Sequence, residues 1–269
     1  MKKLLLSIMF LIISFPFIGL TENLYNSQNE NYRKLLSQLK SSNCRERYIA
    51  VMKFAEIPSA FSEEQVKIAL IQTLEREEPW LSDFKLQSTN CKELFDTEDL
   101  GLYEMILFDT VASLKDQRAV AIFERLKGYQ WLARLGQIDI VLKGFEENNY
   151  GIKGLVLKAI NEEILSNNEK WQDLSSDKRD KIKETLIKAT KEDSDPTGST
   201  KILAVRGLGL IANYGDSNVV TIIQKVSKED SFYQDFSKKP DYSGPKNRYP
   251  VREEAQKVLD QLKAEGKIK

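Results

Sequence analysis

The chemistry open to this chain is limited by a missing residue type, since none of its 269 residues is histidine. Ser-His-Asp and Cys-His nucleophiles, histidine general bases and HExxH zinc sites therefore cannot be built within it. A catalyst would have to rest on carboxylates, lysine, tyrosine or a cofactor. We expect no cofactor and no metal site, because two cysteines without histidine are a poor set of metal ligands.

Clustered carboxylates are the remaining candidates for acid–base chemistry. They occur as Glu75, Glu77 and Glu78 and as the pair Glu162 and Glu163. A glycosidase-like mechanism needs two carboxyl groups about 5–10 Å apart, one on each side of the bond that is cleaved. Both sets lie in sequence with helical periodicity, so we interpret them as solvated helix faces and predict no catalytic residues.

Cys44 and Cys91 are the only two cysteines of the chain. An even count in an exported protein indicates one disulfide bond. Such a bond would close a loop of about 48 residues and contribute about 4 kcal/mol to stability in the chain-entropy view. The alternative is a pair of unrelated buried thiols.

Aromatic and basic side chains gather in one irregular stretch, residues 229–248, which reads EDSFYQDFSKKPDYSGPKNR. This mixture, with proline and glycine, is typical of a loop that contacts a partner. The predicted binding residues are Phe232, Tyr233, Phe236, Lys238, Lys239 and Tyr242. The alternative is that the aromatic side chains fold back and close the end of the helical stack.

A second irregular stretch, residues 79–98, reads PWLSDFKLQSTNCKELFDTE and contains Cys91. Its aromatic residues could also contact a partner. We favour a structural interpretation, in which a disulfide-tethered flap covers the N-terminal hairpins.

The N-terminus has the layout of a secretory signal peptide, which we place at residues 1–21. Lys2 and Lys3 precede the apolar run LLLSIMFLIISFPFIGL, and a polar stretch follows. Cleavage would leave 38 basic and 40 acidic residues. The alternative is an uncleaved anchor, and only in that case do we expect contact with a membrane. The expected location is periplasmic or secreted.

The chain repeats an apolar pattern at an offset of one hundred positions. Residues 102–126 align with residues 202–226 without a gap, and Asp116 falls on Asp216. Each aspartate precedes a helical pattern, where a carboxylate accepts unpaired backbone N–H groups. The offset leaves room for two to three repeats of about 40 residues between the copies.

Amphipathic helical patterns follow one another, and no alternating strand pattern of useful length occurs. Helices are expected in NYRKLLSQLK, CRERYIAVMKFAEI, SEEQVKIALIQTLERE, about 99–114, about 117–128, WLARLGQ, IDIVLKGFEENN, YGIKGLVLKAINEEILSNN, SSDKRDKIKETLIKAT, 202–226 and YPVREEAQKVLDQLKAEG. Gly207 and Gly209 lie inside a helical pattern, so we expect them to permit close helix packing and not to form a phosphate loop.

A three-residue pattern recurs in the first helix of several hairpins. A basic residue is followed three positions later by a small or β-branched residue, and four positions after that by a large one. The members are Arg47, Ala50, Phe54; Lys153, Val156, Ile160; Lys201, Ala204, Leu208; and Arg252, Ala255, Leu259.

This pattern resembles that of the HEAT-repeat family, whose first helix often carries a basic residue, an alanine and a leucine at these spacings. YPVREEAQKVLDQL is the best single match, and the resemblance covers about residues 42–265. It implies an all-α fold, namely a right-handed αα superhelix (a HEAT-like solenoid) of about five helical hairpins plus a C-terminal capping helix. Residues 22–41 would form a linker and helix, and 266–269 a tail.

Charge and architecture together favour a binding role. The 40 basic and 40 acidic residues leave no overall excess of the kind shown by nucleic-acid binders. We predict an exported, non-enzymatic scaffold that binds a protein partner of unknown identity in the cell envelope or outside. The alternatives are a carboxylate-based hydrolase or lyase acting on a cell-wall polymer, and a small-molecule carrier with a closed apolar pocket.

Overall fold

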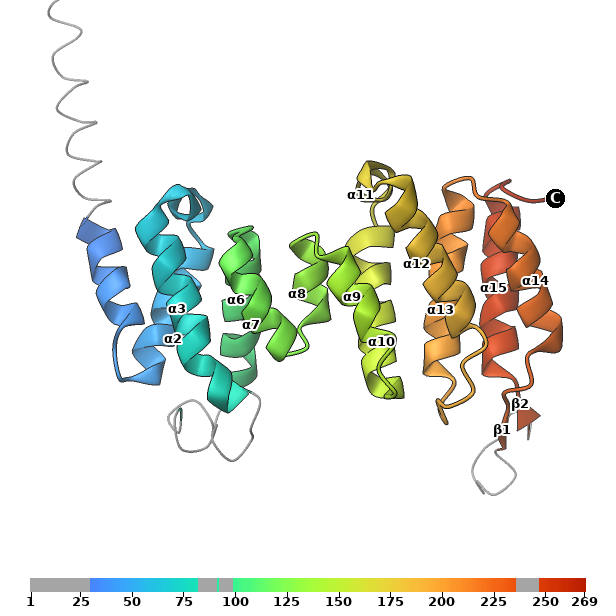
Figure 1. The fold of residues 1–269 in the computed structure, drawn as a ribbon, viewed down its shortest axis with the longest axis horizontal. Coiled ribbons are helices and arrows are strands. Elements are labelled where there is room, and N and C mark those ends of the chain that lie inside the picture. The colour runs from blue at the N-terminus through green and yellow to red at the C-terminus, as the bar shows by residue number, and fades with distance from the viewer. Residues whose placement is uncertain (1–29, 82–90, 92–98, 236–246) are drawn as a thin grey trace, which may run out of the picture. The chain divides into compact units, whose positions relative to one another are not determined.

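The computed structural model describes residues 30–81, 91, 99–235 and 247–269. These residues fall into two compact units that divide between Leu114 and Lys115. Apart from one pair of two-residue strands, the regular elements of the described chain are helices (Figure 1). The expected all-α class is therefore confirmed.

Unit 1 consists of helices throughout its described part. It contains a helix at 30–39, α2 (Cys44–Ala55), the short 3-10 helix η1 (Pro58–Ser62), α3 (Glu64–Leu81) and α6 (Asp99–Ser113). Helix α6 packs against both α2 and α3. The largest side chains buried in this unit include Phe54, Leu70, Leu74, Tyr103 and Leu107.

The expected disulfide bond between Cys44 and Cys91 is present. Cys44 is the first residue of α2, the two Cα atoms are 5.4 Å apart, and both side chains are fully buried. Helix α3 continues to Leu81, into the stretch 79–98 that was expected to be a loop. The remainder of that stretch, apart from Cys91, lies outside the described residues.

Unit 2 comprises Lys115–Lys269 and covers most of the sequence in which repeats were expected. Its elements are η2 (Gln117–Ala119), α7 (Val120–Arg125), α8 (Tyr129–Arg134), α9 (Ile138–Gly144), α10 (Tyr150–Ala159), the π-helical turn η3 (Ile160–Leu165), α11 (Asn168–Asp173), α12 (Ser176–Ala189), α13 (Ser199–Asn213), α14 (Asn218–Glu229), β1 (Gln234–Asp235), β2 (Asn247–Arg248) and α15 (Pro250–Ala264). The long helix expected from residue 150 onward is thus α-helical only as far as Ala159 and continues as the π-helical turn η3.

Helix α13 lies at the centre of the C-terminal part of unit 2. It packs against α10, α12, α14 and α15, and α14 also packs along α15. The side chains of α13 that face these neighbours are fully buried, among them Ala204, Val205, Leu208 and Ile211. Because α13 contacts elements on several sides, it positions both α10 and α15.

The recurring pattern of a basic, a small and a large residue marks core positions. Its small and large members are all buried: Ala50, Phe54, Val156, Ile160, Ala204, Leu208, Ala255 and Leu259. Its basic members each bind an acidic residue or a carbonyl group from elsewhere in the chain: Arg47 binds Glu77, Lys153 binds Glu192, Lys201 binds Asp193 and Asp230, and Arg252 binds the carbonyl oxygen of Asp230. The sequence did not indicate these partners.

The two aligned aspartates cap the turns in the same way, as expected. The Asp116 carboxylate accepts the N–H of Arg118 at 2.9 Å, and the Asp216 carboxylate accepts the N–H of Asn218 at 3.0 Å. The residue before each aspartate has a positive φ, 53° at Lys115 and 104° at Gly215. The aligned stretches therefore form equivalent turns.

Gly207 and Gly209 permit close helix packing, as the sequence predicted. A Cβ atom at Gly207 would lie 2.5 Å from Oδ1 of Asn161 and 2.8 Å from Cδ2 of Leu186. A Cβ atom at Gly209 would lie 2.5 Å from Cγ1 of Val258. Asn161 belongs to the turn η3 and donates a hydrogen bond to the Leu203 carbonyl oxygen at 2.8 Å. Gly207 therefore lets η3 and α12 approach α13 closely.

This packing makes the response to Gly207→Ala predictable. The added methyl group would be forced against Asn161 and Leu186, so the free energy of unfolding should fall by about 1–3 kcal/mol. The matched control is Gly154→Ala in α10, where a Cβ atom would meet nothing within 4 Å. That change should raise the free energy of unfolding by about 0.5–1 kcal/mol. Urea unfolding measures both, and equal stability of the two variants would contradict the close packing.

The Lys153–Glu192 ion pair predicts a response to acid. Hydrogen bonds from Lys153 and then from Ser194 lower the pKa of Glu192 to about 2 from its ordinary value of 4.5. Because the folded state depresses this pKa, the ionised carboxylate stabilises the fold above pH 4.5, and this contribution is lost as the pH falls toward 2. Urea midpoints measured across that window should fall less steeply for Glu192→Gln than for the native chain. Parallel profiles would show that the pair contributes nothing.

Candidate functional site

The segment predicted to bind a partner joins α14 to α15 in unit 2. Strand β1 pairs with β2 in antiparallel fashion, with Gln234 opposite Arg248. Phe236, Lys238, Lys239 and Tyr242 lie outside the described residues. The geometry of the segment therefore rests on residues 230–235 and 247–249.

Asp230 fixes the point at which this segment leaves α14. Its carboxylate accepts hydrogen bonds from Nζ of Lys201 at 3.1 Å and from the N–H of Phe232 at 2.9 Å. Its carbonyl oxygen accepts one from Nε of Arg252 at 2.5 Å. The Lys201 and Asp230 side chains are only 5% and 6% exposed, so this ion pair is shielded from water. The segment is thereby tied to the first turns of both α13 and α15.

Lys201 remains a cation in this buried position. Burial alone would lower its pKa, but hydrogen bonds with Asp193 and Asp230 outweigh that effect and raise the pKa above its ordinary value. Asp193 lies 2.7 Å from the ammonium nitrogen. The charge of Lys201 is thus available to hold Asp230 throughout the neutral pH range.

The two described aromatic residues of the predicted set behave differently. Phe232 is half-buried and folds back onto the turn before α13, where a Cβ atom at Gly198 would lie 2.6 Å from its ring. Tyr233 is 57% exposed. Phe232 therefore follows the alternative interpretation of this segment as a closure of the stack, and only Tyr233 is placed for contact with a partner.

Tyr233 forms an exposed group with two residues that the sequence did not mark for binding. Its ring centre is 6.2 Å from that of Tyr249, which is 38% exposed. The guanidinium carbon of Arg252 lies 4.5 Å above the Tyr249 ring. We call Tyr233, Tyr249 and Arg252 the tyrosine cluster.

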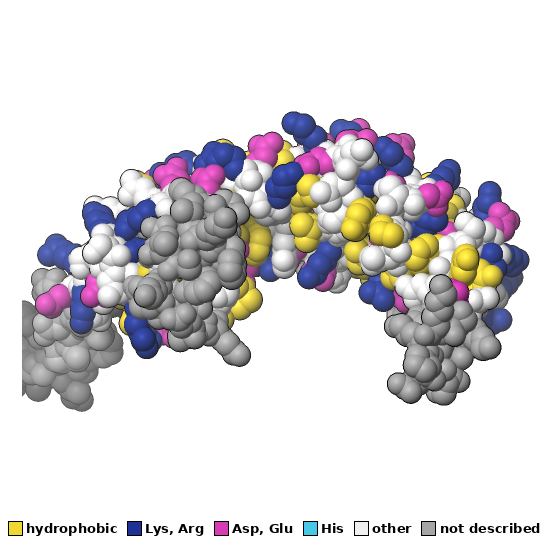
Figure 2. Space-filling model, turned by 90° about the horizontal axis from the view of Figure 1, so that it is seen from below, with side chains coloured by type: hydrophobic (Ala, Val, Ile, Leu, Met, Phe, Trp, Pro, Cys, Tyr) yellow, Lys and Arg dark blue, Asp and Glu magenta, His cyan; other side chains and the backbone are white. Residues whose placement is uncertain are grey.

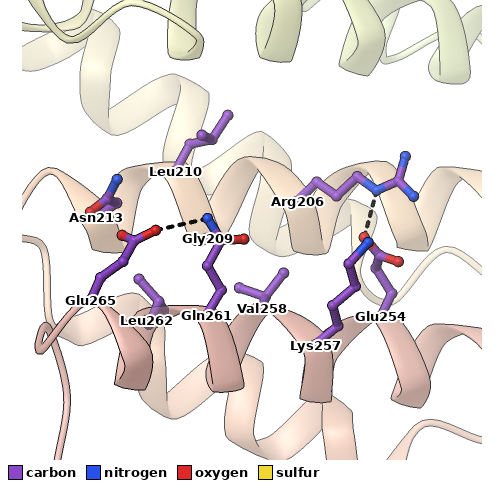
Figure 3. Close-up of a pocket in the computed structure, with 10 residues that line it drawn as sticks. All are labelled: Arg206, Gly209, Leu210, Asn213, Glu254, Lys257, Val258, Gln261, Leu262 and Glu265. Carbon is purple, nitrogen blue, oxygen red and sulfur yellow. Dashed lines mark hydrogen bonds and ion pairs between the residues drawn. The ribbon is translucent and has the colours of Figure 1, made fainter.

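A groove runs between α13 and α15 (Figure 3). It encloses about 260 Å³ and has an apolar floor. The floor consists of Gly209, Leu210, Val258 and Leu262, and the rim of Arg206, Asn213, Glu254, Lys257, Gln261 and Glu265. We call it the α13–α15 groove. The sequence analysis did not identify this groove. The available signals were Gly209, which permits close contact between the two helices, and the outward-facing residues of both helices.

At one end of the groove, the charged groups that remain free to bind a partner are cations. Arg206 binds Glu254 through Nε at 2.6 Å, which leaves its terminal amino groups free to bind a further acceptor. Lys257 lies beside them and has no ion-pair partner among the residues that the structure describes. At the other end, Gln261 donates a hydrogen bond to Glu265 at 2.9 Å. The groove can therefore accept an anionic group near Arg206 and Lys257.

The interpretation of Glu77 as part of a solvated face was wrong. Its side chain is 1% exposed and accepts hydrogen bonds from Nε of Arg47 at 2.5 Å and from the Tyr103 hydroxyl at 3.0 Å. Burial and the charge of Glu77 raise the pKa of Tyr103, so its hydroxyl stays protonated and donates. Glu77 continues the buried stripe of Leu70 and Thr73 along α3, and this register could have revealed it.

Glu163 is also not a solvated residue, whereas its neighbour Glu162 is. The Glu163 side chain is 11% exposed and binds Arg134 and Gln130, each at 2.9 Å. Burial would raise its pKa, but the bonds from Arg134 and Gln130 outweigh this and lower it. A carboxyl group with a lowered pKa is a poor proton donor at neutral pH. The Glu162 side chain is 49% exposed.

Comparisons give no external assignment of the fold or of these sites. No protein-family model, curated protein or solved structure matches the chain. Within the described ranges, no cluster of three or more acidic or cysteine side chains could hold a metal ion. No helix among the described residues is long and apolar enough to cross a membrane.

The different environments of Phe232 and Tyr233 lead to a prediction. Phe232→Ala removes packing against Gly198 and should lower the free energy of unfolding by about 1–3 kcal/mol, below the 3–5 kcal/mol typical of a fully buried phenylalanine. Tyr233→Ala should change it by no more than about 0.5 kcal/mol. Thermal unfolding of the two variants checks this difference. An equal loss in both would mean that Tyr233 is structural and not available to a partner.

Proposed function

We propose that this protein is an exported, non-catalytic scaffold for protein–protein interaction, built from HEAT-like helical repeats. The observation that carries the proposal is the uneven distribution of exposed apolar side chains. Most of them lie on the first helix of a hairpin or next to α15: Ile49 on α2, Leu102 and Met105 on α6, Tyr150 and Leu155 on α10, and Tyr233 and Tyr249 beside α15. Ile68 on α3 is the exception.

The second helices of unit 2 show the opposite character. The exposed residues of α12 and α14 are all polar or charged, for example Lys181, Glu184 and Lys228. Figure 2 views unit 2 from the end at which α10, α13 and α15 begin, and hydrophobic side chains are visible there between charged ones. Scattered apolar residues are normal on any protein. Their concentration on one set of helices favours an interaction surface.

A constant offset between contacting residues supports the repeat architecture in unit 2. Asp139 binds Lys181 and Glu146 binds Lys188, each 42 positions later. Asn161 binds the carbonyl group of Leu203, again 42 positions later. An equal offset at three contacts is what successive copies of one structural unit produce, and it agrees with the repeat length of about 40 residues expected from the sequence.

The proposed location rests on the signal-peptide pattern and on the disulfide bond. Residues 1–21 carry the pattern and lie outside the described residues. The buried Cys44–Cys91 bond is of the kind that persists in oxidising compartments such as the periplasm or the extracellular space. We therefore place the scaffold in the cell envelope or outside the cell.

The proposed non-catalytic role is favoured over the hydrolase alternative by the state of two carboxylates. Glu77 is buried against Arg47, and Glu163 is held by Arg134. A carboxylate pair for polymer cleavage needs one carboxyl group with a raised pKa and access to substrate. Glu77 lacks the access, and Glu163 lacks the raised pKa.

The proposal is tested by affinity capture from an envelope extract with residues 22–269, followed by mass spectrometry. Leu155→Asp places a charge on the apolar face of α10 and should reduce recovery of the captured protein at least tenfold. Thr221→Asp is the matched control on the polar face of α14 and should leave recovery unchanged. Both variants should melt within a few degrees of the native chain. Equal capture by the two variants, or a specific turnover by the purified chain, would contradict the proposal.

A further inference from the structure

We propose that the α13–α15 groove binds a peptide segment in which a carboxylate side chain stands next to a large aliphatic one. This inference rests on the proposed binding function and adds the surface and the chemistry of the partner. The carboxylate would lie near Arg206 and Lys257, at the end of the groove nearest β2 and the start of α15, which we call the hairpin end. The aliphatic side chain would enter the hollow above Leu210 and Val258.

The hollow has the size and lining of a site for one large aliphatic side chain. Its volume of about 260 Å³ lies above Leu210, Val258 and Leu262. Leu210 and Val258 are half-exposed, so water covers part of their apolar surface in the free protein. The floor is held in place from below, because Val258 packs against Gly209. An entering side chain would displace that water without any rearrangement of α13 or α15.

The cations at the hairpin end have binding capacity that the fold does not use. Arg206 engages Glu254 only through Nε. Its terminal amino groups therefore remain available, and such groups bind a carboxylate in bidentate geometry. Lys257 adds a second positive charge with no ion-pair partner among the described residues.

The acidic side chains around these cations are already engaged. Glu254 binds Arg206 and its side chain is 15% exposed, while Glu253 binds Arg248. Asp230 is buried against Lys201. Glu265 lies at the far end of the groove and accepts the hydrogen bond from Gln261. The charge available to a partner at the hairpin end is therefore positive, although the chain as a whole has a net charge of zero.

The site is also organised in advance of binding. The Nε bond of Arg206 to the half-buried Glu254 restricts its guanidinium group before a partner binds. Groups that are fixed before binding lose less conformational entropy when a partner arrives. Arginine is also among the residue types that dominate binding energy at protein interfaces. A peptide partner accounts for the aliphatic hollow and for the cations together, whereas an acidic polysaccharide accounts for the cations alone.

The test uses fluorescein-labelled peptides and fluorescence anisotropy with residues 22–269. The acidic probe GSELELGS should bind at least tenfold more tightly than its amide analogue GSQLQLGS and than GSEAEAGS, which lacks the aliphatic side chains. Its affinity should fall as salt is added, because exposed charges are screened. Lys257→Glu should weaken binding of the acidic probe at least tenfold. The matched control is Lys263→Glu, an exposed residue of α15 that does not line the groove, and it should have little effect.

Several results would overturn the inference. They are the absence of binding by the acidic probe, equal binding of the acidic and amide probes, or equal effects of Lys257→Glu and Lys263→Glu. Binding of polygalacturonate in place of the peptide would also overturn it and assign the cations to a polysaccharide. If the probes fail while Leu155→Asp still reduces capture, the inference falls and the proposed function stands. If Leu155→Asp and Thr221→Asp capture equally, the proposed function falls as well.

Discussion

The packing of the helices in this protein depends on ion pairs. In each pair, a basic residue near the start of a helix binds an acidic residue from another part of the chain. Lys201 on α13 holds Asp230 beyond α14, Lys153 on α10 holds Glu192 beyond α12, and Arg47 on α2 holds Glu77 on α3. Removing such charges from water is costly, and the cost is met only when both partners are in place. Each pair therefore fixes which later residue lies against the start of the helix. Apolar packing alone does not fix this position.

The same constraint produces the candidate site. Asp230 is bound by Lys201 through its carboxylate and by Arg252 through its carbonyl group, so the starts of α13 and α15 are tied to one point. Gly209 then allows α15 to lie against α13 closely enough for Val258 to form part of the groove floor. The bonds of Asp230 to Lys201 and Arg252 therefore help to position both the groove and the tyrosine cluster. Their side chains are in place before any partner binds.

Features with a local cause could be predicted from the sequence. Helices followed from periodicity, the turns at Asp116 and Asp216 from capping chemistry, and the role of Gly207 from its place inside a helical pattern. The Cys44–Cys91 bond followed from the cysteine count together with the signal-peptide pattern. The buried partners Glu77 and Glu163 could not be found in this way, because a charged residue looks alike on a solvated face and in a buried pair until its distant partner is known.

The site was predicted only in part for the same reason. The segment 229–248 was identified from its composition, yet Phe232 packs inward. The groove between α13 and α15 uses residues with ordinary helical spacing. Phe236, Lys238, Lys239 and Tyr242 lie outside the described residues, so their roles stay predictions. The groove lies between two helices that are distant in the sequence, since its paired residues Arg206 and Glu254 are 48 positions apart. The residue pattern of either helix alone therefore does not predict the groove.

A double-mutant cycle on Lys201 and Asp230 tests the central role of these ion pairs most directly. The free energy of unfolding would be measured by urea for the native chain, Lys201→Met, Asp230→Asn and the double variant. Lys201→Met leaves the buried Asp230 carboxylate without its ion pair and should cost about 3–5 kcal/mol. Asp230→Asn leaves Lys201 paired with Asp193 alone and should cost less. The double variant should be more stable than the sum of the two losses implies by at least about 1.5 kcal/mol. Losses that add to within about 0.5 kcal/mol, the behaviour of independent sites, would contradict the account.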